Sequence, residues 1–594
     1  MNAKTIRIGG AAGFWGDSAI ATPQLLAVPG LNYLVYDYLA ETTMSILQRA
    51  RMKDASLGYA TDFVSAVVNP HLAECLSRGI RLIANAGGLN PLGCRDAILA
   101  AARAAGQHPR VAVVLGDDLL SQIEALRAQR VRELRQGTPL PPKVLSANAY
   151  LGARPIAAAL GAGADIVVTG RCVDSAVTLG AAAFEFGWDW RDWDRLAQAS
   201  LAGHIIECGA QATGGLFTDW EEVPEWAGIG YPVVEMRGDG SFDLTKPAAT
   251  GGLVSVPAVA EQMLYEIGDP ANYELPDVVC DFRAVRIDAA GDGRVRVSGA
   301  RGRAPSHRYK VSATWQDGYQ INILMLIRGI RALAKARKTA DALVERTRAQ
   351  LRADKLSDYG ELRIEMLGCE SHYGPHARVG EPREVVLRIA ARHAQAKGLA
   401  FLQKESVSAG TSMGPGTRSH FGGRADIQSV IKLYSFMIDK AAVPVEVHCG
   451  ETVQALSSAA ESGPTEAPPA VAVAAAADLP GEADLVEVPL VQLAWARSGD
   501  KGDDANIGVI ARKAEYLPWL RALLTAERVK DYFAHLVEGS VERFDLPGIA
   551  ALNFLMHGAL GGGGTASLRS DPLGKSYAQM LLDMPLRIPR RLIT

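Results

Sequence analysis

The feature that most constrains this chain is a rhythm repeated through its first 180 residues. A short apolar run is followed by a cluster of Gly, Asn or Asp, and then by a longer Ala- and Leu-rich segment with helical periodicity. Apolar runs without alternation are typical of strands covered on both faces, and the intervening segments are long enough for crossover helices. The pattern therefore predicts an α/β fold, with a largely parallel sheet core and helices on both faces. The six expected strands are residues 5–8, 33–36, 81–84, 111–115, 144–146 and 166–169.

Beyond about residue 250 the pattern changes. Strands are predicted at 278–287, 294–297 and 309–315, with a helix beginning near Tyr319. Segments 385–395 and 427–435 fit a helix and a strand followed by a helix. From residue 486 onwards, two strands around a polar loop, two helices, a further strand and a short helix favour a small α+β domain of ferredoxin-like character.

The length of the chain requires more than one domain, because 594 residues exceed what one hydrophobic core usually organises. Between residues 456 and 484, Ala, Pro and Glu replace the patterned sequence, and aromatic residues are missing. We therefore predict an α/β core domain at 1–455, an Ala/Pro-rich linker at 456–484 and a ferredoxin-like domain at 485–594.

Charge and cysteine usage exclude several classes of partner. A formal net charge of −3 provides no basic footprint for nucleic acid. The N-terminus lacks an export signal, and no stretch of about 20 apolar residues is present, so we expect a cytoplasmic protein without a membrane span. The seven cysteines are scattered singly, so neither disulfides nor a metal site is expected. A homo-oligomer is the usual state of such a chain.

The loops after the expected strands hold the first candidates for a ligand site. In an open parallel sheet, ligands bind outside the carboxyl ends of the strands, where glycines permit close backbone approach to a phosphate or carboxylate. If these strand ends are neighbours, their side chains converge on one site. Taken singly, each polar residue could instead cap a helix, or form a surface ion pair such as Arg171 with Asp174. The candidates are Gly13, Trp15, Asp17, Asn85, Gly87, Gly88, Asp117, Asn148, Arg171 and Asp174.

Two further segments add candidates. A stretch after residue 203 contains Glu207 and a Thr-Gly-Gly turn, which either binds an anion through backbone N–H groups or reverses the chain. A charged loop between two strands near residue 500 is either solvated or completes a site against the core domain. The candidates are Glu207, Thr213, Gly214, Gly215, Arg497, Asp500, Lys501 and Asn506. We assign Asp174, Glu207 and Arg171 as catalytic, because a carboxylate in a crevice needs only burial to acquire a pKa suited to acid–base work.

Five sequence segments resemble one known family. They are GGAAGFWGDS near the start, IANAGGLNP, VVTGRCVDSA, and the late segments ARSGDKGDDANIGV and GGGGTASLRSDPLGK. Together they are similar to the acyclic terpene utilisation family AtuA, over nearly the whole chain, including a core domain and a ferredoxin-fold domain. The resemblance implies a place in the catabolism of citronellol and geraniol, which proceeds through branched acyl-CoA thioesters. It carries over no residue roles, so the site residues above come from the loops alone.

These observations lead to two hypotheses of different kinds. The first is an enzyme that acts on a branched acyl-CoA by acid–base chemistry of the hydratase or lyase kind, with CoA as part of the substrate and no separate cofactor. The second is a non-catalytic accessory or scaffold subunit that binds other terpene-pathway enzymes. A nicotinamide-dependent reductase is disfavoured, because neither GxGxxG nor a P-loop follows the first strand.

Overall fold

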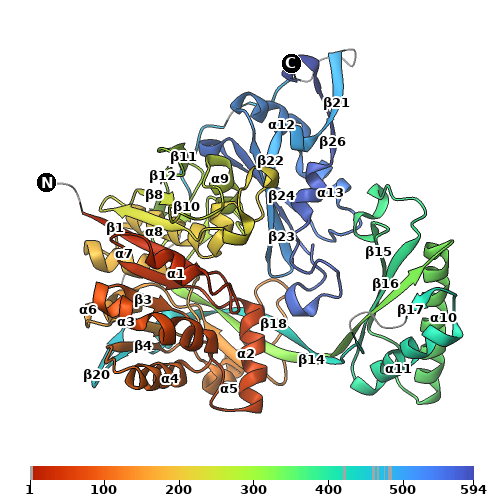
Figure 1. Cartoon of the computed structure of the whole chain (residues 1–594), viewed down its shortest axis with the longest axis horizontal. Helices are drawn as coiled ribbons and strands as arrows, with labels where there is room; N and C mark the ends of the chain where they lie inside the picture. The colour runs from red at the N-terminus through yellow and green to blue at the C-terminus, as the bar shows by residue number, and fades with distance from the viewer. Residues whose placement is uncertain are drawn as a thin grey trace.

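A computed structural model describes residues 4–418, 423–457, 462–463, 467–473, 475–478 and 484–593. The remainder of the expected linker 456–484 lies outside the described residues. Figure 1 shows three parts: a main body, an outer lobe that projects from it, and a C-terminal module that lies against both. We use "outer lobe" for residues 319–427 and "C-terminal module" for residues 484–593. Within the described part of the chain, no helix is long and apolar enough to cross a membrane.

The main body is built on one large sheet that is mixed rather than largely parallel. Its strand order is β11-β12-β8-β7-β1-β2-β3-β6-β4-β19-β20. The five central strands are parallel: β1 (Thr5–Ala12), β2 (Tyr33–Tyr36), β3 (Arg81–Ala84), β6 (Ile166–Thr169) and β4 (Val111–Leu115).

Strands from later in the chain extend both edges of this sheet in the antiparallel sense. The prediction of a largely parallel sheet is therefore wrong beyond its centre. Consecutive pairs of these strands form hairpins, which need no crossover helix, whereas a parallel neighbour requires one. They are β7 (Val233–Arg237), β8 (Phe242–Thr245), β12 (Val295–Ser298) and β11 (Arg286–Ala289) on one side, and β19 (Val445–Cys449) and β20 (Thr452–Leu456) on the other.

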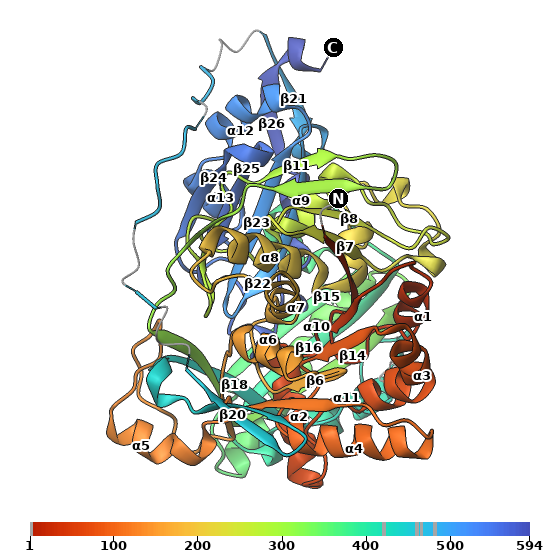
Figure 2. The same ribbon diagram turned by 90° about the vertical axis from the view of Figure 1, so that its left-hand side faces the viewer.

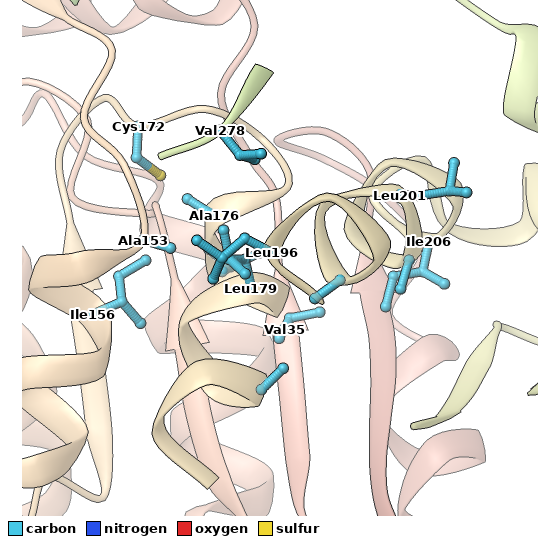
Figure 3. Close-up of a cluster of buried hydrophobic side chains, with 14 of the residues drawn as sticks. Val35, Ala153, Ile156, Cys172, Ala176, Leu179, Leu196, Leu201, Ile206 and Val278 are labelled. Atoms are coloured by element: carbon cyan, nitrogen blue, oxygen red, sulfur yellow. The ribbon is translucent and has the colours of Figure 1, made fainter. Parts of the chain in front are cut away.

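Helices cover both faces of the central strands, as predicted. Successive residues of a strand point to opposite faces, and accordingly Val35 packs into one hydrophobic core while Leu34 and Tyr36 pack into the other. The first core lies under α6 (Arg154–Gly161), α7 (Ala176–Phe186) and α8 (Trp193–Ile206), and Figure 3 shows Ile156, Leu179 and Leu196 from these helices gathered there. The second lies under α1 (Ala21–Leu26), α3 (Asn69–Arg78) and α4 (Pro91–Ala104).

A second sheet corrects several expectations. The fifth expected strand, β5 (Ser146–Ala149), does not extend the parallel sheet but pairs antiparallel with β14 (Arg308–Arg328). β14 does not give way to a helix near Tyr319. It is 21 residues long in all and continues past Tyr319 to Arg328, in the outer lobe. Its first half pairs with β18 (Gln428–Asp439) and its second with β16 (Glu384–His393), so segments 385–395 and 427–435 are strands. The cross-strand pairing of these three segments outweighs their local propensity.

The outer lobe adds β15 (Glu361–Leu367), α10 (Ala332–Ala353) and α11 (Ala396–Ser412) around the far half of β14 (Figure 1). The C-terminal module contains an antiparallel sheet in the order β22-β23-β25-β24. These strands are β22 (Ala494–Lys501), β23 (Asp504–Ala511), β25 (Ala551–Met556) and β24 (Val541–Leu546). The module packs around its own core with α12 (Leu517–Leu523), α13 (Ala526–Tyr532) and α14 (Tyr577–Leu582).

The C-terminal module is bound to the main body by buried polar contacts. Asn506 donates from Nδ2 to the carbonyl oxygen of Leu264 at 2.7 Å, at the end of α9 (Val256–Leu264). Asn553, beside it on β25, donates to the carbonyl oxygens of Ile267 and Gly268. In Figure 1, α9 lies beside β22 of the module, and α9 contacts both β22 and β23, while Figure 2 shows α8 and α9 overlapping the module in the view turned by 90°. The hairpin of β22 and β23 is thereby held against the helices that cover the central sheet.

Candidate functional site

The carboxyl ends of the parallel strands meet at Arg171, which follows β6. The backbone N–H of Arg171 donates to Oδ2 of Asp117, after β4, at 2.8 Å. The same oxygen accepts a hydrogen bond from Nδ2 of Asn148, on β5, also at 2.8 Å. Burial raises the pKa of Asp117 to about 7. Three residues predicted from separate loops are therefore in direct contact, although β5 belongs to the other sheet.

The guanidinium of Arg171 is buried and holds a carboxylate. Its Nη1 donates to Asp174 Oδ1 at 2.7 Å and to the carbonyl oxygens of Leu39 and Cys172. It lies over the ring of Tyr150, 4.2 Å from the ring centroid. The side chain of Arg171 is 3% exposed, whereas that of Asp174 is 36% exposed. The pair is thus not the surface ion pair of the alternative interpretation: a buried cation fixes a carboxylate that remains open to solvent.

A small polar cavity adjoins Arg171. It has a volume of about 10 Å³, and its lining includes Asn148, Tyr150 and Ser312. Asn148 Oδ1, Arg171 Nε and Ser312 Oγ are buried and have no hydrogen-bond partner among the described residues. A cavity of this size with two or three polar partners suits a single water molecule.

Asp37 and Asn85 form a second buried pair at the same edge. Asn85, after β3, donates from Nδ2 to Asp37 Oδ1 and accepts the backbone N–H of Tyr38 at 2.7 Å. Burial raises the pKa of Asp37 well above its usual range, and repulsion from Asp174 and Glu207 adds to the shift. Asn85 therefore holds a carboxyl group that sequence reasoning did not select.

Glu207 and His204 form the buried acid–base pair of the site. Glu207 Oε1 lies 3.1 Å from His204 Nδ1, and His204 Nε2 lies 3.1 Å from the carbonyl oxygen of Met263. Burial lowers the pKa of His204 to about 4, and the charge of Lys501 contributes. Burial, with repulsion from Asp174, raises the pKa of Glu207 well above its usual range.

These two shifts agree with the hydrogen bonds. A neutral imidazole has one donor and one acceptor nitrogen. The carbonyl oxygen of Met263 can only accept, so His204 Nε2 carries the proton and Nδ1 is an acceptor. The short contact at Nδ1 then requires a hydrogen on Glu207. Glu207 is therefore a neutral carboxylic acid whose proton points at His204.

The loop after β1 packs closely against the backbone of Glu207 and Cys208. A Cβ atom at Gly13 would lie 2.8 Å from Cα of Cys208, so only glycine allows this approach. Asp17 accepts the backbone N–H of Gly13 at 2.9 Å and the hydroxyl of Tyr231 at 2.6 Å. Trp15 is half-buried against the second core. These predicted residues shape the loop, and the N–H of Gly13 is occupied within it.

The remaining glycine candidates lie in turns with internal partners. Gly87 donates its N–H to the carbonyl oxygen of Thr169 at 3.0 Å, and Gly88 adopts a left-handed conformation with φ +51°. Thr213 Oγ1 donates to the carbonyl oxygen of Ala210, to which Gly215 also donates. Gly214, at φ +99°, forms the bend between them. The Thr-Gly-Gly segment thus matches the chain-reversal alternative.

The loop near residue 500 brings charges from the C-terminal module to the main body. Arg497 donates to the carbonyl oxygen of Leu216 at 3.0 Å and, with Asn506, contributes to the contact between the two parts. Asp500 lies 3.3 Å from Lys575, and burial with repulsion from Glu266 raises the pKa of Asp500 to about 7. The ammonium of Lys501 lies 5.1 Å from the ring centroid of Tyr273.

Several charged residues of the site were missed. Asp37 and Glu41 follow β2, whose loop contributed no candidates to the prediction. The rule that ligands bind at the carboxyl ends of parallel strands selects both residues. The Lys310 ammonium and Arg171 outweigh burial and lower the pKa of Glu41 to about 2. Tyr273 and Glu266 come from a segment without a strand-end signal, so tertiary packing alone reveals them.

No three His, Cys, Asp or Glu side chains among the described residues are arranged to hold a metal ion. The cysteines are free thiols, and burial raises the pKa of Cys208, beside Glu207, well above its usual range. A thiol held in its neutral form is a poor nucleophile. The proton-carrying groups of this site are accordingly carboxyl groups.

Comparisons with known proteins agree with the resemblance of the sequence motifs. The family model described as "Acyclic terpene utilisation family protein AtuA" matches residues 6–449. The model described as "AtuA ferredoxin-like domain" matches residues 488–587, within the C-terminal module. No curated protein and no solved structure matches the chain.

Proposed function

Because the chain belongs to the acyclic terpene utilisation family AtuA, we propose that it catalyses an acid–base step on a terpenoid intermediate. Family membership indicates a role in acyclic terpene utilisation. The reaction that we propose is addition of water to a branched, unsaturated acyl-CoA, or the reverse elimination, as a hydratase or lyase performs it. CoA enters as part of the substrate.

The observation that carries the proposal is the contrast between two carboxyl groups of the site, one buried against a histidine and one paired with an arginine. Glu207 is held as a neutral acid by burial and by the acceptor nitrogen of His204. Asp174 forms an ion pair with the Arg171 guanidinium, 2.7 Å away, and is 36% exposed. Titratable groups whose environments favour different protonation states are suited to act as acid and base in one reaction.

The two groups support a balanced addition. Asp174 accepts a proton from water as the water oxygen bonds to the β-carbon of the substrate double bond. The electron pair of the double bond shifts toward the thioester carbonyl. The Glu207 O–H turns away from His204 and donates its proton to the α-carbon. The product is a 3-hydroxyacyl thioester. Solvent then removes the proton from Asp174 and returns one to Glu207.

Turnover of geranyl-CoA, whose double bond is conjugated with the thioester, tests the proposal, with hydration, or exchange of the α-proton for deuterium in ²H₂O, as the readout. Glu207→Gln can still donate a hydrogen bond to His204 but cannot transfer a proton, and Asp174→Asn removes the base. We expect each to lower kcat on the order of 10²- to 10⁴-fold. Asp292→Asn, in an exposed turn, is the matched control.

Two results would contradict the proposal. The first is wild-type protein that neither hydrates nor exchanges any branched acyl-CoA. The second is a Glu207→Gln variant that turns over as fast as the Asp292→Asn control. A protein that binds the thioester without converting it would instead support a non-catalytic role.

A further inference from the structure

The tip of the hairpin formed by β22 and β23 is fixed in place from two directions. Arg135, in the main body, donates to the carbonyl oxygen of Lys501 at 3.1 Å and forms an ion pair with Asp504 at 2.6 Å. Within the module, His557 Nδ1 lies 2.8 Å from Asp504 Oδ2. The carbonyl oxygen of Asp503 accepts two backbone N–H groups, from residues 559 and 560. The backbone of Lys501 is therefore held rigidly, although its side chain is exposed.

The Lys501 ammonium faces the acid–base pair through one aromatic ring. It lies 5.1 Å from the ring centroid of Tyr273, which lies 5.8 Å from the ring centroid of His204. His204 in turn contacts Glu207 at 3.1 Å. The positive charge of Lys501 reaches both groups, because it lowers the pKa of His204 and opposes the rise in the pKa of Glu207. The ammonium is thus close enough to act on the site electrostatically.

The three N–H donors of Lys501 are available to a ligand. Among the described residues, its ammonium has no carboxylate within 4.0 Å and no hydrogen-bond acceptor, only the Tyr273 ring. Lys575, in the same module, differs: its ammonium contacts the Tyr265 hydroxyl, Glu266 at 3.4 Å and Asp500 at 3.3 Å. The Lys575 ammonium is therefore occupied by contacts within the protein. The Lys501 ammonium lies across the Tyr273 ring from the His204–Glu207 pair and has no acceptor among the described residues.

We propose that Lys501 binds the anionic oxygen of the substrate, so that the C-terminal module completes the acid–base site of the main body. This inference rests on the proposed function and names the group that the site recognises. That group is a negatively charged oxygen next to the reacting carbons, supplied either by a free carboxylate or by a thioester carbonyl as it gains charge. An ammonium with free donors binds such an oxygen by a charge-assisted hydrogen bond.

The first test is calorimetric titration of the full-length protein with sodium citronellate and with the neutral alcohol citronellol. We expect Lys501→Met to weaken citronellate binding on the order of ten-fold or more, and Lys501→Arg to retain most of it. Binding of citronellol should not change. The control is Lys513→Met. Lys513, also in the module, lies over a tyrosine ring, 5.4 Å from the Tyr516 ring centroid, and its ion-pair partner among the described residues is Glu515.

The second test separates the two sources of the anionic oxygen. With geranyl-CoA, a role at the developing oxyanion predicts that Lys501→Met lowers kcat more than it raises KM. Loss of the ammonium charge also raises the pKa of Glu207, so the alkaline limb of the rate profile should move to higher pH. Lys501→Arg keeps that limb in place. The other charged or titratable groups around Glu207 are unchanged in both variants; they are His204, Asp174, Glu266, Tyr273, Arg171, Asp37 and Cys208.

The outcomes distinguish this inference from the proposed function. Citronellate binding and a rate profile that are the same in Lys501→Met, Lys513→Met and wild type would overturn the role of Lys501, even if the protein turns over acyl-CoA. Loss of citronellate affinity in Lys501→Met alone would support that role, even if no turnover is found and the proposed reaction fails. Wild-type protein that binds neither the carboxylate nor a thioester would overturn the role.

Discussion

Replacement of Asp117 by Asn tests whether the strand ends hold a carboxyl group that favours its neutral form. The side chain is 3% exposed, and its Oδ2 accepts hydrogen bonds from the backbone of Arg171 and from Asn148. Burial is the main reason that the pKa of Asp117 is raised to about 7. An asparagine oxygen can accept the same two hydrogen bonds but does not titrate.

The direction of the Asp117 pKa shift determines how the stability of the protein changes with pH. The unfolded chain binds the proton with the ordinary pKa of 3.8, and the folded chain with a pKa of about 7. The stabilisation is therefore complete below the unfolded value and is lost as the pH rises to the folded one. At about 1.4 kcal/mol per pKa unit, the loss is about 4 kcal/mol in total, of which about 2 kcal/mol falls between about pH 5 and pH 7.

The assay is thermal unfolding of wild type and Asp117→Asn at a series of pH values. Because the variant lacks this loss, its Tm relative to wild type should rise by roughly 2 °C between about pH 5 and pH 7. Asp292→Asn is the control, since Asp292 lies in an exposed turn. A Tm difference that stays flat with pH for Asp117→Asn, as expected for the control, would refute the reasoning.

Two further substitutions test the support of the site. Gly13→Ala places a Cβ atom 2.8 Å from Cα of Cys208, so it should shift the Glu207 segment and lower turnover on the order of 10²-fold. In Gly161→Ala the added Cβ meets nothing nearer than 3.9 Å, so turnover should not change. Equal turnover rates in the two variants would contradict this reasoning. Arg512→Met removes a two-pronged ion pair with Asp219, at 2.5 and 2.7 Å, that joins the module to the main body. We expect the free energy of unfolding to fall by about 1–2 kcal/mol, and the same loss in an Asp219→Asn background would show that the pair is not its cause.

Much of the site edge could be predicted from the sequence because one rule placed it. Polar residues after buried parallel strands lie at one edge of a sheet, and this rule selected Asn85, Asp117 and Arg171 before their contacts were known. Asn148 was selected by the same rule for a wrong reason. Its strand pairs with β14, and it reaches Asp117 from the second sheet. A short apolar run does not specify which sheet it joins.

What could not be predicted depends on contacts between distant segments. Local sequence around β14 predicts a strand that ends before Tyr319, yet pairing with β16 keeps residues 319–328 extended. Glycines were selected as ligand-binding residues, whereas Gly87 and Gly214 are required by backbone approach or by positive φ. A glycine-rich loop has the same sequence whether its N–H groups face a ligand or their own chain.

The protonation state of Glu207 links the C-terminal module to the chemistry of the main body. Glu207 can donate to His204 only while His204 is neutral, and the charge of Lys501 favours the neutral form. Lys501 lies at the tip of the β22–β23 hairpin. Arg135 binds this tip, and Asn506 of the hairpin binds the end of α9. The carbonyl oxygen that fixes the tautomer of His204 belongs to Met263, in the same helix. The helix that receives the module thus also sets the proton on Glu207, so docking of the module and the acid form of Glu207 are parts of one arrangement.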